Sequence, residues 1–272
     1  MRLRYFGTLL TIFICSIVYG QNPVADSTRL AGFARFLYDQ KLYDFAAEEY
    51  ERLHYLFPNE AGYLTQLLKS YRKLNKYDEV EKKGASLDLK NPDILKEYVL
   101  SMALNDQPAV AQLVFDKHQD VLPDASSKKM TLDLAVLRQN WRQSDSLYKV
   151  WNVKDDGYYE IIHSGLNQKR KSPFLAGTLS ALLPGAGRVY AKDVKDGIIS
   201  FIFIAATSYQ SYRRFSQGGI KSAGGWIYGG FAAGFYIGNI YGSIKSAKSY
   251  NKKQKSKLYE QSKRHIDLYY GF

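Results

Sequence analysis

The sequence predicts an all-α protein, in which an N-terminal solenoid of helical-hairpin repeats is followed by a C-terminal α-helical membrane hairpin. Three observations predict this architecture. The first half repeats itself every 34 residues, its apolar residues recur at helical spacing, and the second half contains long uncharged stretches. Charge divides the chain in the same way, because residues 21–163 hold 19 Lys and Arg against 22 Asp and Glu, whereas residues 164–272 hold 17 against 4.

Residues 1–20 are predicted to be a signal peptide. Arg2 and Arg4 precede an apolar run that is short for a membrane span, and the small residue Gly20 suits cleavage after it. An uncleaved anchor and a lipid attached to Cys15 are alternatives. Cys15 is the single cysteine, which excludes a disulfide scaffold and a cysteine-based metal site.

Residues 21–163 are predicted to form the helical repeat domain. Similar residues recur 34 positions apart, as Tyr43 and Tyr77 do, and as Pro58 and Pro92 do. Each proline is expected to end the second helix of a unit. The apolar faces of the first two helices are formed by Leu30, Phe33, Ala34 and Leu37, and by Tyr43, Ala46, Ala47, Tyr50 and Leu53.

These residues resemble the tetratricopeptide repeat family over residues 27–123. The first unit matches the family at Leu30, Ala34, Leu37, Tyr43, Ala46, Tyr50, Leu53 and Pro58. The second unit departs from it at Val80 and Gly84, where the family prefers Ala and an aromatic residue. A third unit is about three residues short near Gln107 and Pro108, and a fourth helix pair fits loosely. The resemblance implies stacked helix pairs whose concave surface binds a peptide or helix of a protein partner. Tyr43 and Tyr77 are expected to fill the core.

Residues 164–250 are predicted to be embedded in a membrane. The uncharged stretches at 197–212 and 222–244 are expected to span it as a hairpin, although the first of them is slightly short. The uncharged stretch at 172–187 is broken by Pro184 and is expected to be a re-entrant or interfacial segment.

Four glycines recur every four residues in the last uncharged stretch, and on a helix they would form one face of small residues. They are Gly230, Gly234, Gly238 and Gly242. Such a face lets a second helix approach closely within a membrane, in the same chain or in a homo-oligomer. A soluble glycine-rich core is the alternative.

The segment from Leu182 to Gly197 carries the most distinctive motif. It resembles the Pro-Gly-x-Gly-x-x-Tyr entry of small bacterial two-span membrane domains, and the matching residues are Pro184, Gly185, Gly187, Tyr190 and Gly197. Arg188 replaces the usual Gln, and Ala191 stands where Gly is common. The resemblance implies a location in a membrane and no reaction.

Residues 251–272 form a basic tail, which we expect to begin as a continuation of the preceding helix and to lie on anionic lipid, with plain solubility as an alternative. Nucleic acid is not expected as a partner, because the chain is predicted to be exported. The repeat domain is expected on the periplasmic side of the bacterial cell envelope. Positive charge on every connection leaves the orientation of the spans open, and the choice of inner or outer membrane is also open.

Motifs for catalysis, cofactors and metals are absent from the sequence, which holds no H-E-x-x-H, G-x-S-x-G or P-loop pattern and no histidines at ligand spacing. The sequence therefore predicts a non-enzymatic envelope membrane protein that displays a repeat domain for protein–protein interaction or scaffolding. One alternative is a component of an envelope transport or assembly machine that oligomerises through its glycine-rich helix. Another is an enzyme with an unrecognised site.

Overall fold

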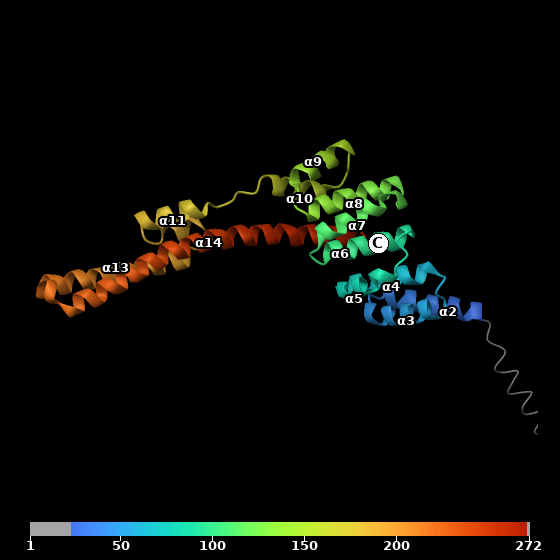
Figure 1. The fold of residues 1–272 in the computed structure, drawn as a ribbon, viewed down its shortest axis with the longest axis horizontal. Coiled ribbons are helices and arrows are strands. Elements are labelled where there is room, and N and C mark those ends of the chain that lie inside the picture. The colour runs from blue at the N-terminus through green and yellow to red at the C-terminus, as the bar shows by residue number, and fades with distance from the viewer. Residues whose placement is uncertain (1–22, 271–272) are drawn as a thin grey trace, which may run out of the picture. The chain divides into compact units, whose positions relative to one another are not determined.

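The computed structural model describes residues 23–270, and within them the chain is all-α, as predicted, with 13 α-helices and no strand (Figure 1). The predicted signal peptide at 1–20 lies outside the described residues. The helices divide into two compact units, with Asn140 at the end of the first and Trp141 at the start of the second. The helices between Trp141 and residue 163 thus belong to the second unit, although the sequence grouped them with the repeats.

The first unit is a series of antiparallel helices in which each helix packs against the next. In addition, α4 packs against α6 and α6 against α8. The helices are α2 (Pro23–Asp39), α3 (Tyr43–Leu56), α4 (Ala61–Lys73), α5 (Tyr77–Lys83), α6 (Pro92–Leu104), α7 (Pro108–His118) and α8 (Asp124–Leu137).

The turns inside the helix pairs share one backbone geometry. Lys41, Asn75, Asp106 and Gln139 all have positive φ, and they lie 34, 31 and 33 residues apart. At each turn the next N–H donates to the carbonyl five residues back, the pattern of a Schellman helix end. The shortest interval lies before Asp106 and contains α5, which has only seven residues. The missing residues are therefore in α5 and the connection after it, not near Gln107 and Pro108.

The two repeat prolines differ in their positions. Pro58 lies in the turn after α3, whereas Pro92 is the first residue of α6, so Pro92 begins a helix instead of ending one. Pro suits this position because the first N–H of a helix has no partner within the helix. Among the other repeat residues, Ala34, Ala46 and Tyr50 are buried, and Leu30, Tyr43 and Tyr77 are half-buried.

Tyr98 explains the departure from the repeat pattern at Gly84. A Cβ atom at Gly84 would collide with the hydroxyl end of the Tyr98 ring, which comes from α6. The aromatic side chain expected at position 84 is thus replaced by one from the following helix, and Val80 is fully buried beside it in the same core.

A buried ion pair joins α4 to α6. The Nε atom of Arg72 lies 2.9 Å from Oε2 of Glu97, and both side chains are almost wholly excluded from solvent. Burying both charges is costly unless they pair well, so this contact fixes the distance and register between the two helices.

The second unit consists of shorter helices packed on one long helix. They are α9 (Trp141–Val150), α10 (Asp156–Leu166), α11 (Pro173–Leu182), α12 (Ala186–Tyr190), α13 (Val194–Gly218) and α14 (Ala223–Tyr269). α13 and the first half of α14 form a hairpin, α11 and α12 pack on the middle of α14, and α10 packs near its end. The predicted tail at 251–272 is helical as far as Tyr269.

Within residues 23–270 no helix combines the length and the hydropathy needed to cross a membrane. The two spans predicted at 197–212 and 222–244 are therefore wrong. In α13 the uncharged part is only 16 residues long and lies between Asp196 and Arg213 of the same helix. In α14 the glycines, serines and Asn239 lower the mean hydropathy of a stretch whose length would otherwise suffice.

Candidate functional site

The glycines of the Pro-Gly-x-Gly motif bring three backbone segments together. Gly185 has φ +85°, and a Cβ atom there would meet the carbonyl of Gly197, at the first buried turn of α13. A Cβ atom at Gly187 would likewise meet the carbonyl of Ala176 in α11. Only residues without a side chain permit these two approaches, so the motif glycines hold α11, α12 and α13 in close contact. Pro184 lies directly before this turn.

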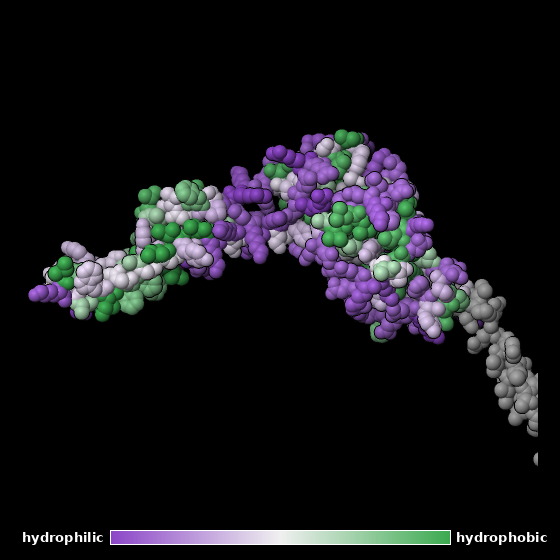
Figure 2. Space-filling view, viewed as in Figure 1, coloured by the Kyte–Doolittle hydropathy of each residue, from purple (hydrophilic) through white to green (hydrophobic). Residues whose placement is uncertain are grey.

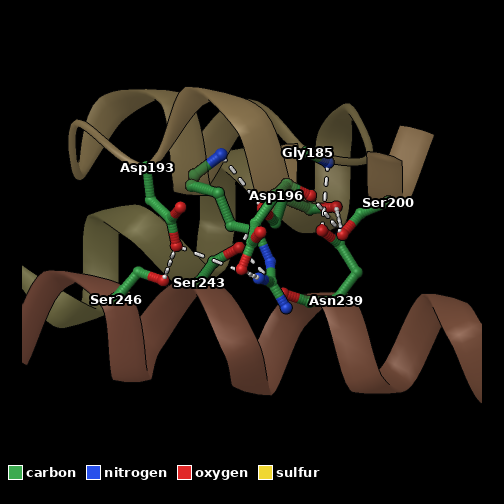
Figure 3. A network of polar contacts seen from close by, with 10 residues as sticks. Gly185, Asp193, Asp196, Ser200, Asn239, Ser243 and Ser246 are labelled. Atoms are coloured by element: carbon green, nitrogen blue, oxygen red, sulfur yellow. Dashed lines mark hydrogen bonds and ion pairs between the residues drawn. The ribbon is translucent and has the colours of Figure 1, made fainter. Parts of the chain in front are cut away.

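A buried polar network fixes the motif to α14 (Figure 3). The side chain of Asn239 accepts a hydrogen bond from the N–H of Gly185 at 3.1 Å and donates one to the carbonyl of Ser180 at 3.3 Å. The hydroxyls of Ser180 and Ser243 lie 2.6 Å apart. Because the Ser243 hydroxyl donates its proton to the carbonyl of Asn239, Ser180 is the donor between the two hydroxyls. The network therefore satisfies its buried side chains.

Arg188 lies at the edge of this network and is held by acidic residues. Its Nη1 atom is 3.0 Å from Asp196 and 3.9 Å from Asp193. Asp193 also accepts a hydrogen bond from the hydroxyl of Ser246, at 2.7 Å (Figure 3). The guanidinium group lies over Gly242, and its Nε atom is buried without a hydrogen-bond partner. Arg188 thus places a fixed positive charge at this point of the motif.

Tyr190, the last residue of the motif, anchors the chain that leads into α11. Its hydroxyl accepts a hydrogen bond from the N–H of Ser172 at 3.0 Å, and the Nζ atom of Lys171 lies 4.5 Å from the centre of its ring. The side-chain amide of Asn251 forms two further hydrogen bonds with the backbone of Lys171, both 2.8 Å long. The motif and the chain before α11 are therefore held to α14 at two places, by Asn239 at Gly185 and by Asn251 at Lys171.

A pocket of about 610 Å³ opens beside Arg188, between the turn that joins α12 to α13 and one face of α14. Its charged lining residues are Arg188, Lys192, Asp193, Asp196, Lys245 and Lys253. Its volume lies within the range of small-ligand sites.

The hairpin of α13 and α14 exposes large apolar side chains (Figure 2). In α13 only Gly197, Ile204 and Ser211 are buried, one position in every seven, so the helix contacts the rest of the unit along a narrow seam. The contact with α14 is made at Gly225 and Gly229, where a Cβ atom would approach Phe215 and Ser211 respectively.

The predicted row of glycines is divided in two by the structure. A Cβ atom at Gly230, Gly234 or Gly238 would find nothing within 4 Å, whereas one at Gly242 would collide with the guanidinium of Arg188. The first three glycines thus face away from α13, and the intramolecular helix contact uses Gly225 and Gly229 instead.

The groups with shifted pKa values in the first unit include one tyrosine and one histidine. Burial, with smaller effects from the charges of Glu51 and Glu79, raises the pKa of the Tyr71 hydroxyl to about 12. Burial and the nearby ammonium of Lys83 lower the pKa of His54, whose Nδ1 atom has no hydrogen-bond partner. Across residues 23–270 no three His, Cys, Asp or Glu side chains gather in a way that could hold a metal ion.

The partners of the motif could not be identified from the sequence. Asn239, Ser243 and Ser180 lie in uncharged stretches where the signal was hydrophobicity, and they meet across 59 and 63 residues. A polar Asn within an apolar helix is the one sequence signal that could have indicated a buried contact.

Compared with protein-family models, curated proteins and solved structures, the chain matches none.

Proposed function

We propose that this chain is a non-enzymatic protein of the bacterial cell envelope that displays an interaction domain at a membrane. The second unit inserts its apolar hairpin into a lipid bilayer. The first unit is a tetratricopeptide-like repeat domain on the periplasmic side that binds a protein partner.

The observation that carries the proposal is the wide exposed apolar surface of α13 outside its narrow seam with the rest of the unit. Between residues 198 and 203 the apolar side chains are each 47–57 % exposed, and they are Ile198, Ile199, Phe201, Ile202 and Phe203. Successive residues of a helix are about 100° apart, so these side chains cover an arc of about 200°, and the buried Gly197 and Ile204 lie on the remaining side. Leaving such a surface in water costs about 25 cal/mol for each Å². Placing the apolar surface of the hairpin in lipid removes that cost, and a hairpin that lies along the bilayer surface requires no helix that crosses the bilayer.

Aromatic residues at the tip of the hairpin support insertion into lipid. Trp226 packs edge-on against Phe215 and donates a hydrogen bond to the carbonyl of Ile220, yet its side chain is largely exposed. Tyr209 and Tyr212 are exposed near it on α13. Amphipathic rings of this kind are enriched where a bilayer meets water.

Two features of the first unit support a repeat domain that binds protein. The left-handed residues recur 34, 31 and 33 positions apart, close to the period of tetratricopeptide repeats. Phe33, Phe36 and Phe45 on the first helix pair are 50–58 % exposed, although phenylalanine is usually buried. Exposed aromatic residues are typical of binding surfaces.

The insertion is tested by carbonate extraction of cell envelopes that contain the full chain. We expect the wild-type protein to stay in the membrane pellet and the double variant Ile199→Asp/Ile202→Asp to be released. The matched control is Tyr55→Asp/Leu113→Asp, which changes two side chains of the first unit that are 84 % and 70 % exposed. Retention of the α13 variant in the pellet, or equal release of both variants, would contradict insertion.

A second test concerns the partner of the repeat domain. A photo-reactive amino acid at position 36 of the full chain should cross-link one discrete protein in envelopes. The same group at position 113, also exposed in the first unit, is the control. Cross-linking that is absent, or identical from both positions, would argue against a binding surface on the first helix pair.

An oligomer formed through α14 is the second candidate, and the open space beside Gly230, Gly234 and Gly238 favours it. A second copy could pack there as closely as Gly225 and Gly229 pack on α13. The variant Gly234→Leu/Gly238→Leu would then lower the oligomer size of the detergent-solubilised protein. An unchanged oligomer size would refute an oligomer formed through these glycines, and the display function would stand without it.

A further inference from the structure

The pocket beside Arg188 has a surplus of positive charge that nothing in the described chain neutralises. Four cationic and two anionic side chains line it. Both carboxylates are engaged, since Asp196 pairs with Arg188 and Asp193 accepts the hydroxyl proton of Ser246. In contrast, within residues 23–270 the side chains of Lys192, Lys245 and Lys253 make no hydrogen bond or ion pair.

Arg188 adds a donor that is already in place. Its side chain is only 19 % exposed and is held by Asp196, so little conformational entropy is lost when a ligand binds it. The Nε atom of the same guanidinium is buried without a partner. An anion at the pocket would therefore meet a fixed guanidinium on one side and flexible ammonium groups on the others. This is the combination that suits a phosphate group.

The position of the pocket indicates where such a phosphate would come from. On α13 the apolar run begins two residues after Asp196, which lines the pocket. On α14 the first residue that lines the pocket is Gly242, directly after the apolar part of the hairpin. Figure 2 shows the same change along the unit, from apolar residues on the hairpin to hydrophilic residues on the following part of α14. If the hairpin lies in a bilayer, the pocket lies at the depth of the lipid phosphates.

We propose that this pocket binds the phosphate of an anionic phospholipid headgroup. The inference deepens the proposed function and rests on it, because the lipid source of the phosphate requires the hairpin to be inserted. The phosphate is bound non-covalently, by ion pairs and hydrogen bonds. Lys245 and Lys253, which lie about two turns apart on α14, bind the phosphate from that helix, and Arg188 binds it from the motif.

The test measures binding of the full-length protein to two kinds of vesicle. One is pure phosphatidylcholine, and the other is an equal mixture of phosphatidylcholine and phosphatidylglycerol. The pocket variant is Lys245→Gln/Lys253→Gln. The control is Lys248→Gln/Lys252→Gln, which removes the same charge from the same helix at positions that do not line the pocket. Glutamine is a good helix former, so both variants should keep the helical circular-dichroism signal of the wild type.

We expect both double variants to lose some affinity for the mixed vesicles, since any lysine near an anionic surface contributes to binding. The pocket variant should lose about tenfold more than the control, and neither should change its binding to pure phosphatidylcholine. Equal losses in the two variants would overturn the pocket and leave a diffuse basic surface.

Free phosphate is distinguished by competition. If inorganic phosphate releases the wild-type protein from mixed vesicles, and chloride at equal ionic strength does not, the pocket holds soluble phosphate and the lipid assignment is overturned. Failure of the proposed function is a separate result, because it would abolish binding of the wild-type protein to pure phosphatidylcholine as well. If the wild-type protein binds pure phosphatidylcholine and the two variants lose equal affinity for the mixed vesicles, only the pocket proposal is refuted and the proposed function stands.

Discussion

The guanidinium group of Arg188 occupies the space above Gly242 that a side chain at position 242 would fill. Gly242→Ala should therefore displace Arg188 from Asp196 and lower the free energy of unfolding by about 1–3 kcal/mol, the cost of leaving a buried charged donor unpaired. Gly238→Ala is the matched control, since the space at position 238 is open and alanine should stabilise the helix by about 1 kcal/mol. Thermal unfolding of the two variants, each in the same detergent, measures the difference. Equal midpoints would show that Arg188 moves aside without cost.

The turn at Gly185 permits a second matched comparison. Gly185 and Gly219 both have positive φ, but only Gly185 faces backbone within 4 Å, at the carbonyl of Gly197. Gly219→Ala should cost about 1–3 kcal/mol from backbone strain alone. Gly185→Ala should cost clearly more and should expose the second unit to limited proteolysis under native conditions. A smaller effect at Gly185 than at Gly219 would argue against the close approach of the two backbone segments.

The buried pair of Arg72 and Glu97 predicts an asymmetric mutational response. Glu97→Ala removes the carboxylate that pairs with the buried guanidinium of Arg72 and should lower the free energy of unfolding by about 3–5 kcal/mol. The double variant Arg72→Met/Glu97→Leu replaces both charges by apolar groups and should recover most of this loss. Urea unfolding of the full chain, followed at the transition of the first unit, gives both values.

The control for the Glu97 variants is Glu79→Ala, which removes an exposed ion-pair partner of Lys82 in the same unit. Exposed pairs contribute little, so the midpoint in urea should hardly move. If Glu97→Ala behaved like Glu79→Ala, the pair between α4 and α6 would not stabilise the fold.

His54 should make the stability of the first unit depend on pH. Its pKa is lowered in the folded chain, mainly by burial and then by Lys83, so the unfolded chain binds its proton more readily. The stabilising contribution is therefore complete above the unfolded pKa, about 6.5, and is lost as the pH falls through the lower folded pKa. Urea midpoints measured on either side of about pH 6.5 should fall on the acid side.

The variant His54→Gln is the test of this assignment. Glutamine cannot be protonated in this range, so the fall in the urea midpoint on the acid side should become smaller. If the wild type and the variant show the same pH dependence, another group causes it.

Much of the first unit could be predicted from the sequence, because its order is local. Apolar residues at helical spacing indicated the helices, and the buried residues Ala34, Ala46 and Tyr50 lie on the faces that this spacing predicted. The recurrence of Pro58 and Pro92 was misleading, since one lies in a turn and the other begins α6. Proline restricts φ in both places, so residue type alone does not distinguish them.

The contacts of the second unit depend on long-range pairing, which the sequence could not provide. The motif singled out Gly185, Gly187 and Gly197, but it did not indicate that the side chain of Asn239 accepts a hydrogen bond from the N–H of Gly185. The expected spans failed because the absence of charge alone does not make a stretch apolar enough, since glycine and serine also lower its hydropathy. The helical course of residues 245–269 was predicted only at its start, since a change from apolar to basic residues resembles a domain border.

The unbroken length of α14 has a mechanical consequence. The helix has 47 residues, which corresponds to about 70 Å at 1.5 Å per residue, and proline is absent from it. Near its start it contacts Phe215 of α13 at Gly225, and near its end His265 lies 3.2 Å from Asp155 beside α10. Every turn shares backbone hydrogen bonds with the next, so α14 has no hinge at which a twist could be absorbed. A rotation imposed on the hairpin is therefore transmitted as torque to the residues beside α10.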